Sequence, residues 1–256
     1  MRLHLFEFED QPWFPAPLRV AMTSYLVAAY GITPFPKLWA ARLSGLMHRD
    51  TPNKIVDLAS GSGGPLRIVL REFGPLGYPL EVTLTDLYPN GREYHFPANT
   101  TSAIRYWPYP VDATEVPAEL TGIRTMFAAF HHFRPADARR ILSNAAAQRQ
   151  HLCIFEATSR TPLAIVLALL IPVLVLVLTP KVRPLTWFQV VFTYLIPVLP
   201  LLIFWDGLVS QLRTYSVEEL EELVRPPQSP DYRWDCGWIE VPGNPMRLPY
   251  LIGHPS

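Results

Sequence analysis

The sequence predicts an α/β protein with a Rossmann-like, seven-stranded, mostly parallel sheet and helices on both of its faces. The first observation is a short apolar run at residues 55–58, which leads into a glycine-rich turn and then a helical pattern. The second is a strand pattern at residues 81–86, Glu-Val-Thr-Leu-Thr-Asp, which ends in Asp86. The third is a pair of apolar runs at residues 123–130 and 151–157 with a helical pattern between them. Strands that alternate with helices in this way are typical of parallel sheets.

The turn after the first predicted strand is suited to ligand binding. Gly61, Gly63 and Gly64 allow the backbone to turn sharply and to pass close to a ligand. The helix that follows offers free backbone N–H groups at its start. Asp86 ends the next strand about 20 residues further on, where an acid accepts hydrogen bonds from ribose hydroxyls.

The segment Asp57-Leu-Ala-Ser-Gly61-Ser-Gly63-Gly64 resembles motif I of the class I S-adenosylmethionine-dependent methyltransferases. A dinucleotide enzyme would more often carry Gly-x-Gly-x-x-Gly, and the first glycine of that pattern is replaced here by alanine. The resemblance implies that S-adenosylmethionine is the cofactor. It also implies that the cofactor site includes Asp57, Ala59, Ser60, Gly61 and Gly63.

Three further segments follow in the order of that family. Thr85-Asp86-Leu87 resembles the ribose-binding end of strand two, Val111-Asp112-Ala113-Thr114 the adenine-binding loop, and Phe130-His131-His132-Phe133 the end of strand four beside the methyl group. The resemblance therefore adds to the cofactor site Asp86, Leu87, Asp112, Ala113 and Phe130. Asp112 is also a common turn residue, and Asn90 and Tyr94 are either cofactor contacts or plain loop residues.

Composition excludes some classes of function. The chain has 256 residues, with 22 Lys and Arg against 22 Asp and Glu, so no net positive charge favours nucleic acid as a partner. The two cysteines, Cys153 and Cys236, lack the spacing of a metal site, and we predict no bound metal. Their use is typical of a reducing cytoplasm. Acids near the N-terminus indicate that no secretion signal is present.

Residues 1–50 are predicted to form an N-terminal helical cap. Aromatic residues and prolines dominate residues 1–17, and helices are expected at residues 18–31 and from about Phe35 to Met47. Glu9 and Asp10 are either solvated turn acids or residues that face the substrate.

The remaining soluble elements complete the sheet. We expect residues 87–110 to be irregular because prolines interrupt them, with a strand end at Val111. Residues 51–160 then form the predicted cofactor-binding core. Residues 207–256 supply a helix with a capping box at Ser216 and Glu219, and a closing antiparallel strand pair.

Residues 161–206 depart from the soluble pattern. Leu163–Leu178 and Leu185–Trp205 are almost wholly apolar, and the turn between them carries Lys181 and Arg183. A run that is apolar on every side does not form an ordinary surface helix. We therefore predict an inserted hydrophobic helical hairpin. It either contacts membrane lipid through residues 162–206 or forms a homodimer interface. In the membrane, a hairpin that enters without fully crossing, with Lys181 and Arg183 at the lipid headgroups, fits the sequence better than two spans.

The predicted function is methyl transfer from S-adenosylmethionine to a small or lipid-like acceptor at the cytoplasmic face of the cell membrane. His132, or else His131, is the candidate general base, although both histidines could simply end their strand. Two alternatives remain: a cofactor-binding protein without catalysis, and a membrane-associated oxidoreductase that uses a dinucleotide.

Overall fold

A computed structural model of the chain describes residues 2–47, 53–61, 63–89, 103–225 and 231–256. It divides into two compact units, each built from two separate segments. The helical unit comprises Met1–Thr33 and Thr158–Tyr215, and the sheet unit comprises Pro34–Ala157 and Ser216–Ser256. These boundaries differ from the division predicted at residues 50, 160 and 206. The first helix belongs with the hydrophobic segment, whereas the second helix belongs with the sheet.

The sheet unit has one seven-stranded sheet, which confirms the predicted fold class. Its strands are β1 (Asn53–Asp57), β2 (Leu80–Leu84), β3 (Ala103–Tyr106), β4 (Ile123–Phe127), β5 (Leu152–Phe155), β6 (Tyr232–Glu240) and β7 (Arg247–Pro255). They lie in the order β3-β2-β1-β4-β5-β7-β6. The first five strands are parallel, and β7 pairs antiparallel with both β5 and β6. Successive strands are added on one side of β1 and then, from β4 on, on its other side, so the switch point at which such sheets bind ligands lies between β1 and β4.

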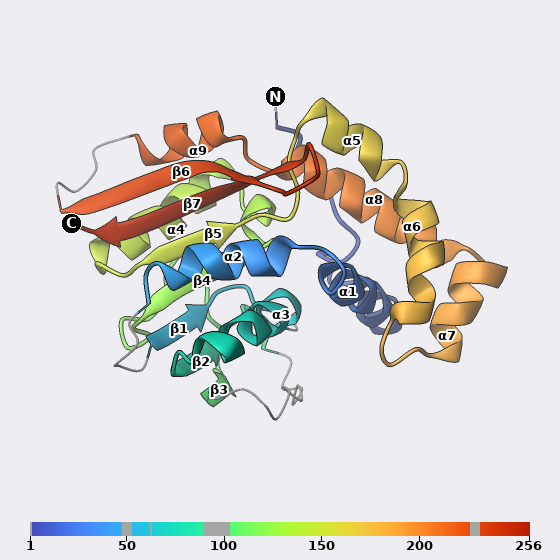
Figure 1. The fold of residues 1–256 in the computed structure, drawn as a ribbon, viewed down its shortest axis with the longest axis horizontal. Helices are drawn as coiled ribbons and strands as arrows, with labels where there is room; N and C mark the ends of the chain where they lie inside the picture. The colour runs from blue at the N-terminus through green and yellow to red at the C-terminus, as the bar shows by residue number, and fades with distance from the viewer. Residues whose placement is uncertain (1, 48–52, 62, 90–102, 226–230) are drawn as a thin grey trace. The chain divides into compact units, whose positions relative to one another are not determined.

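Helices cover both faces of this sheet (Figure 1). They are α2 (Phe35–Ser44), α3 (Gly64–Phe73), α4 (Pro135–Ala147) and α9 (Val217–Val224), with short 3-10 turns η1 (Gly74–Leu76) and η2 (Phe130–His132). α2 lies beside α3 on one face, and α4 lies beside α9 on the other. The indole of Trp39 in α2 stacks on Phe155 and packs near Phe127, so α2 is anchored to the centre of the sheet. The predicted capping box is confirmed: Ser216 and Glu219 cap α9.

One strand contradicts the prediction that residues 87–110 are irregular. β3 pairs parallel with β2, from Glu81 opposite Ala103 to Leu84 opposite Tyr106. It is the outermost strand, and its side chains alternate between exposed and half-buried, so it lacks the apolar signature of a buried strand. The strand also ends at Tyr106, not at Val111 as the sequence indicated.

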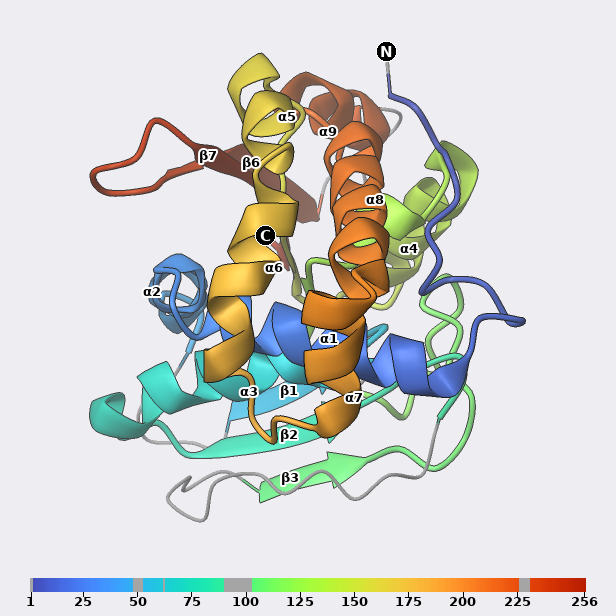
Figure 2. The same ribbon diagram turned by 90° about the vertical axis from the view of Figure 1, so that its right-hand side faces the viewer.

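The helical unit consists of α1 (Ala16–Tyr30), α5 (Pro162–Ala168), α6 (Ile171–Leu178), η3 (Thr179–Lys181), α7 (Trp187–Val190), the π-helical turn η4 (Val191–Leu195) and α8 (Val198–Arg213). α1 packs against both α6 and α8 (Figure 2). Their common core contains Met22 and Tyr25 of α1, Val175 and Leu178 of α6, and Leu199 of α8. The hydrophobic segment, residues 161–206, therefore packs in one folded unit with the N-terminal helix α1.

A buried hydroxyl cluster fixes the positions of these helices. Tyr25 Oη lies 2.8 Å from Thr179 Oγ1 and 2.7 Å from Thr193 Oγ1. Thr179 Oγ1 also donates to the Val175 carbonyl. Because buried polar groups are costly unless paired, these bonds favour one arrangement of α1, η3 and η4 over its alternatives.

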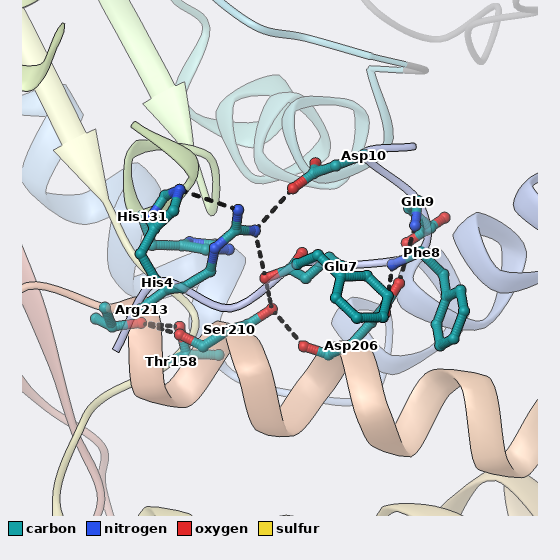
Figure 3. A network of polar contacts seen from close by, with 12 residues as sticks. His4, Glu7, Phe8, Glu9, Asp10, His131, Thr158, Asp206, Ser210 and Arg213 are labelled. Atoms are coloured by element: carbon teal, nitrogen blue, oxygen red, sulfur yellow. Dashed lines mark hydrogen bonds and ion pairs between the residues drawn. The ribbon is translucent and has the colours of Figure 1, made fainter. Parts of the chain in front are cut away.

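A second polar network holds the N-terminal segment on α8 (Figure 3). Arg213 Nη1 lies 3.0 Å from Glu7 Oε1 and 2.7 Å from Asp10 Oδ2. The Asp206 carboxylate accepts the backbone N–H groups of Phe8 and Glu9 at 2.8 and 3.1 Å. Burial raises the pKa of Asp206 to about 6. Asp10 lies in a turn and is exposed, as the turn-acid interpretation expects, and its carboxylate also pairs with Arg213.

The two hydrophobic runs do not form straight helices. Within the described part of the chain, no single helix has the length and apolar composition needed to cross a membrane. Two bent pairs meet that test together: Pro162–Ala168 with Ile171–Lys181, bent by 52°, and Trp187–Leu195 with Val198–Arg213, bent by 83°.

Candidate functional site

The residues expected to bind a cofactor lie where the parallel strands end. Asp57 is the last residue of β1, Asp86 follows β2 by two residues, and Phe130 and His131 lie in η2 just after β4. The carboxyl ends of parallel strands share one edge of the sheet, so topology brings these side chains to the same edge. Asn90, Tyr94 and Ser62 lie outside the described residues.

The loop after β1 has the conformation of a ligand cradle. Ala59, Gly61 and Gly63 have φ angles of +50°, +51° and +68°, all in the left-handed region that favours glycine. A Cβ placed on Gly61 would meet no atom within 4 Å, so open space lies beside that residue. Ala59, which stands where the dinucleotide pattern has its first glycine, has the same left-handed conformation as the two glycines.

Asp86 joins this loop to the second and third strands. Its Oδ2 accepts the backbone N–H of Gly61 at 2.8 Å, and its Oδ1 accepts that of Tyr88 at 2.9 Å. The carbonyl of Asp86 accepts the N–H of Val111 at 2.9 Å. The glycine loop, Asp86 and the segment that contains Asp112 are thus brought together by direct hydrogen bonds, and Leu87 beside them is exposed.

Asp112 takes the conformation of a turn residue. Its Oδ1 accepts the N–H of Thr114 at 2.8 Å, and its side chain is otherwise exposed, whereas Ala113 is buried. The turn interpretation therefore describes its local structure. An exposed carboxylate that is held by its own turn is also available to a ligand.

Asp57 is the most deeply buried of the predicted site acids. Its residue is only 3% exposed, and its Oδ1 accepts a 2.6 Å hydrogen bond from Thr125 Oγ1 on β4. Burial raises the pKa of Asp57 to about 7, a shift that the hydrogen bonds from Thr125 and Ser60 oppose. Its backbone carbonyl also accepts bonds from Ser60 Oγ and Thr85 Oγ1, at 2.8 and 2.9 Å. Asp57 therefore joins β1, β2 and β4 at the base of the loop.

A histidine–carboxylate pair lies after β4 and β5. Glu156 follows β5 and holds His131 twice: its Oε1 accepts the His131 backbone N–H at 2.8 Å, and its Oε2 lies 2.7 Å from His131 Nδ1. The ring of His132 lies 4.3 Å from that of His131. Because a carboxylate can only accept, this contact places a proton on His131 Nδ1 and fixes the orientation of the ring.

Glu156 is a site residue that sequence reasoning missed. The available signal was its position: an acid that follows one strand, beside a strand that ends in two histidines. Phe130, also a predicted cofactor contact, is buried and packs near Phe133 with ring centroids 6.5 Å apart.

Comparison with known proteins supports the fold. No protein-family model matches the sequence, and no curated protein matches it. Among solved structures, the plantazolicin methyltransferase BpumL in complex with SAH is 15% identical, with a TM-score of 0.58 over 97% of this chain and 94% of that chain.

Two other solved structures are more distant. A SAM-dependent methyltransferase from Aquifex aeolicus is 11% identical, with a TM-score of 0.44 over 85% of this chain and 89% of that one. An O-methyltransferase family protein from Burkholderia thailandensis is 16% identical, with a TM-score of 0.41 over 97% and 58%. The match to BpumL is the informative one, and it confirms the class I S-adenosylmethionine-dependent methyltransferase fold. That residues 161–206 are an insertion into this fold stays a prediction.

Proposed function

We propose that this protein is an S-adenosylmethionine-dependent methyltransferase that acts on a small or lipid-like acceptor at a membrane face. One observation carries the proposal: a left-handed glycine loop after β1 is hydrogen-bonded to the acid that follows β2, through Gly61 N–H and Asp86 Oδ2. This arrangement lies at the switch point of a sheet whose fold is similar to that of a methyltransferase solved in complex with SAH.

The residues present fit that cofactor. The open space beside Gly61 would admit the amino-acid portion, Asp86 would accept hydrogen bonds from ribose hydroxyls, and Asp112 would accept one from the adenine amine. When bound, the cofactor supplies an electrophilic methyl group on a sulfonium. The protein's own contribution is to hold the two reactants in line and to exclude water.

His131 is the base that the geometry favours. The sequence pointed first to His132, but the carboxylate of Glu156 orients the His131 ring through Nδ1, so Nε2 is the nitrogen that would accept a proton. An imidazole held this way accepts a proton from an acceptor hydroxyl or amine as the acceptor attacks. Glu156 then acts as a positioning residue that stabilises the imidazolium.

The hydrophobic segment supports a membrane-face location. Many of the large apolar side chains over residues 163–201 are exposed. We propose that they bind membrane lipid on the cytoplasmic side, which would bring a lipophilic acceptor near the enzyme. A homodimer that buries the same side chains is the competing explanation. If the intact chain stays in the soluble fraction without detergent, as a dimer by analytical ultracentrifugation, the membrane location is wrong.

Cofactor binding is tested by titration calorimetry with S-adenosylmethionine and with NAD. We expect the first ligand to bind and NAD not to bind. Gly63→Val should abolish binding because a branched side chain is strained at a φ of +68° and fills the cradle. Asp86→Ala should weaken binding by about 1.5–3 kcal/mol, the range for hydrogen bonds to a charged group. Tighter binding of NAD would favour the oxidoreductase alternative.

Catalysis is tested separately with the methyl-tritiated cofactor and a total lipid extract. We expect tritium to enter the organic phase only when the protein is present. His131→Ala should slow transfer by about 100-fold or more, a typical contribution of a general base. His132→Ala tests the other candidate base: a loss as large as that of His131→Ala would assign the role to His132. If the cofactor binds but no acceptor fraction becomes labelled, a binding protein without catalysis is the better description.

A further inference from the structure

The outward face of α6 lacks the polar side chains of an ordinary surface helix. Val175 and Leu178 point into the core of the helical unit, together with Ile171. On the opposite side Val173 and Val177 are exposed, the latter by 68%. A helix at the edge of a water-soluble unit normally carries charged or polar residues on this side. Both faces of α6 are instead apolar, and only one of them has a partner within the helical unit.

The elements after α6 extend this apolar face and add a basic turn. Trp187 at the start of α7 and Leu195 at the end of η4 are 76% and 75% exposed. The two segments lie together, because Tyr194 Oη donates to the Leu176 carbonyl at 2.7 Å. Between them Lys181 and Arg183 are both exposed. The sequence contains no Asp or Glu from residue 157 to residue 205, so this stretch has no side-chain carboxylate.

We infer that α6, the basic turn and α7–η4 form a surface that inserts in the plane of a bilayer containing anionic phospholipids. The apolar side chains would enter the acyl boundary, Trp187 would lie at the interface, and Lys181 and Arg183 would pair with lipid phosphates. This inference rests on the proposed membrane-face function and names its partner and mode of binding.

In-plane insertion fits the structure better than a crossing. The hydrophobic pairs are bent by 52° and 83°, and each uses one face in the core of the helical unit. That core includes the hydroxyl cluster around Tyr25, and the same unit holds the ion pairs of Arg213. Moving the helices across a bilayer would expose these polar groups to lipid, at a high cost.

The charge of the turn favours lipid over a second copy of the chain. A two-fold dimer through this surface would place Lys181 and Arg183 at or beside an interface in which residues 157–205 of both copies hold no acid to pair with them. Phosphate headgroups supply the opposite charge. The surface is therefore complementary to an anionic membrane.

Vesicle binding tests this inference. We expect the full chain to co-sediment with phosphatidylcholine vesicles that contain phosphatidylglycerol, and at least tenfold less with pure phosphatidylcholine vesicles or at high salt. The double variant Val177→Glu with Leu195→Glu should lose at least tenfold in partition coefficient. Lys181→Gln with Arg183→Gln should lose the preference for anionic lipid. Ser143→Glu, on the exposed face of α4, is the matched control and should bind like the unmodified chain.

Two measurements on chains that keep the apolar surface intact make the inference falsifiable even if the glutamate variants misfold. Trp187 emission should shift to the blue on addition of anionic vesicles, and Trp187→Phe should remove that shift. A fluorophore on Lys181→Cys should be quenched by dithionite outside preformed vesicles. Protection of that fluorophore would mean that the hairpin crosses the bilayer. A stable dimer without vesicle binding would mean that a second copy covers the surface, and either result overturns the inference. Calorimetry of S-adenosylmethionine, run in parallel, shows independently whether the proposed function itself holds.

Discussion

The buried carboxyl of Asp57 should make the stability of the protein depend on pH in a defined direction. The folded-state pKa is about 7, against a reference value of 3.8. The native state therefore holds a proton that the unfolded state releases between these values, and stability falls as pH rises through that window. The shift lowers the free energy of unfolding by about 4 kcal/mol in total once the pH is well above 7. About 3 kcal/mol of this loss occurs between pH 5 and pH 8.

Asp57→Asn removes this titration and keeps an oxygen that can accept from Thr125. In urea denaturation without cofactor, the stability of the asparagine variant relative to the unmodified chain should rise by about 3 kcal/mol from pH 5 to pH 8. Thr125→Val, which removes the hydrogen bond that lowers the pKa, should steepen the pH dependence of the unmodified carboxyl. Glu119→Gln, at an exposed carboxyl, is the control. A stability difference that stays constant between pH 5 and pH 8 would refute the reasoning.

Three further changes have effects that can be derived from the structure. Ala59→Gly should raise the free energy of unfolding in urea by about 1 kcal/mol, because Ala59 has a φ of +50°, a left-handed conformation that costs alanine more than glycine. Gly122→Ala should cost at least about 2 kcal/mol in the same assay, since φ is +137° and the new Cβ would lie 2.5 Å from the Lys54 carbonyl oxygen; a neutral result would contradict that geometry. Tyr25→Phe should cost about 1–3 kcal/mol, because Thr179 and Thr193 lose a buried partner. An unchanged thermal midpoint would show that water replaces the tyrosine hydroxyl.

The sheet could be predicted where its strands are buried on both faces. β5 is a continuous apolar run, β1, β2 and β4 are mostly buried strands whose apolar residues are interrupted by polar ones, and the glycine loop and its acid are local signals. β3 could not be predicted in this way, because it is half-exposed and short, and its pairing with β2 depends on a neighbour far along the chain.

The polar partners in the site were harder to anticipate for the same reason. Asp57 and Asp86 are recognisable from their places at strand ends. The pairing of Glu156 with His131 depends on the adjacency of β4 and β5, and that of Asp57 with Thr125 on the adjacency of β1 and β4. No spacing within one segment reveals such contacts. The break of each hydrophobic run into two bent helices has no single signal either, although Pro197 marks one of the bends.

The helical unit is built from two chain segments that are far apart in the sequence, and this has a consequence for biosynthesis. Its core joins Met22 and Tyr25 of α1 to Leu199 of α8, so α1 emerges from the ribosome long before its partners exist. Until then the apolar side of α1 needs another cover, whether a chaperone or the emerging sheet segment. A chain that lacks residues 1–33 would leave the inner faces of α6 and α8 permanently uncovered. We therefore expect N-terminal truncation to cause aggregation even if every residue of the sheet unit is retained.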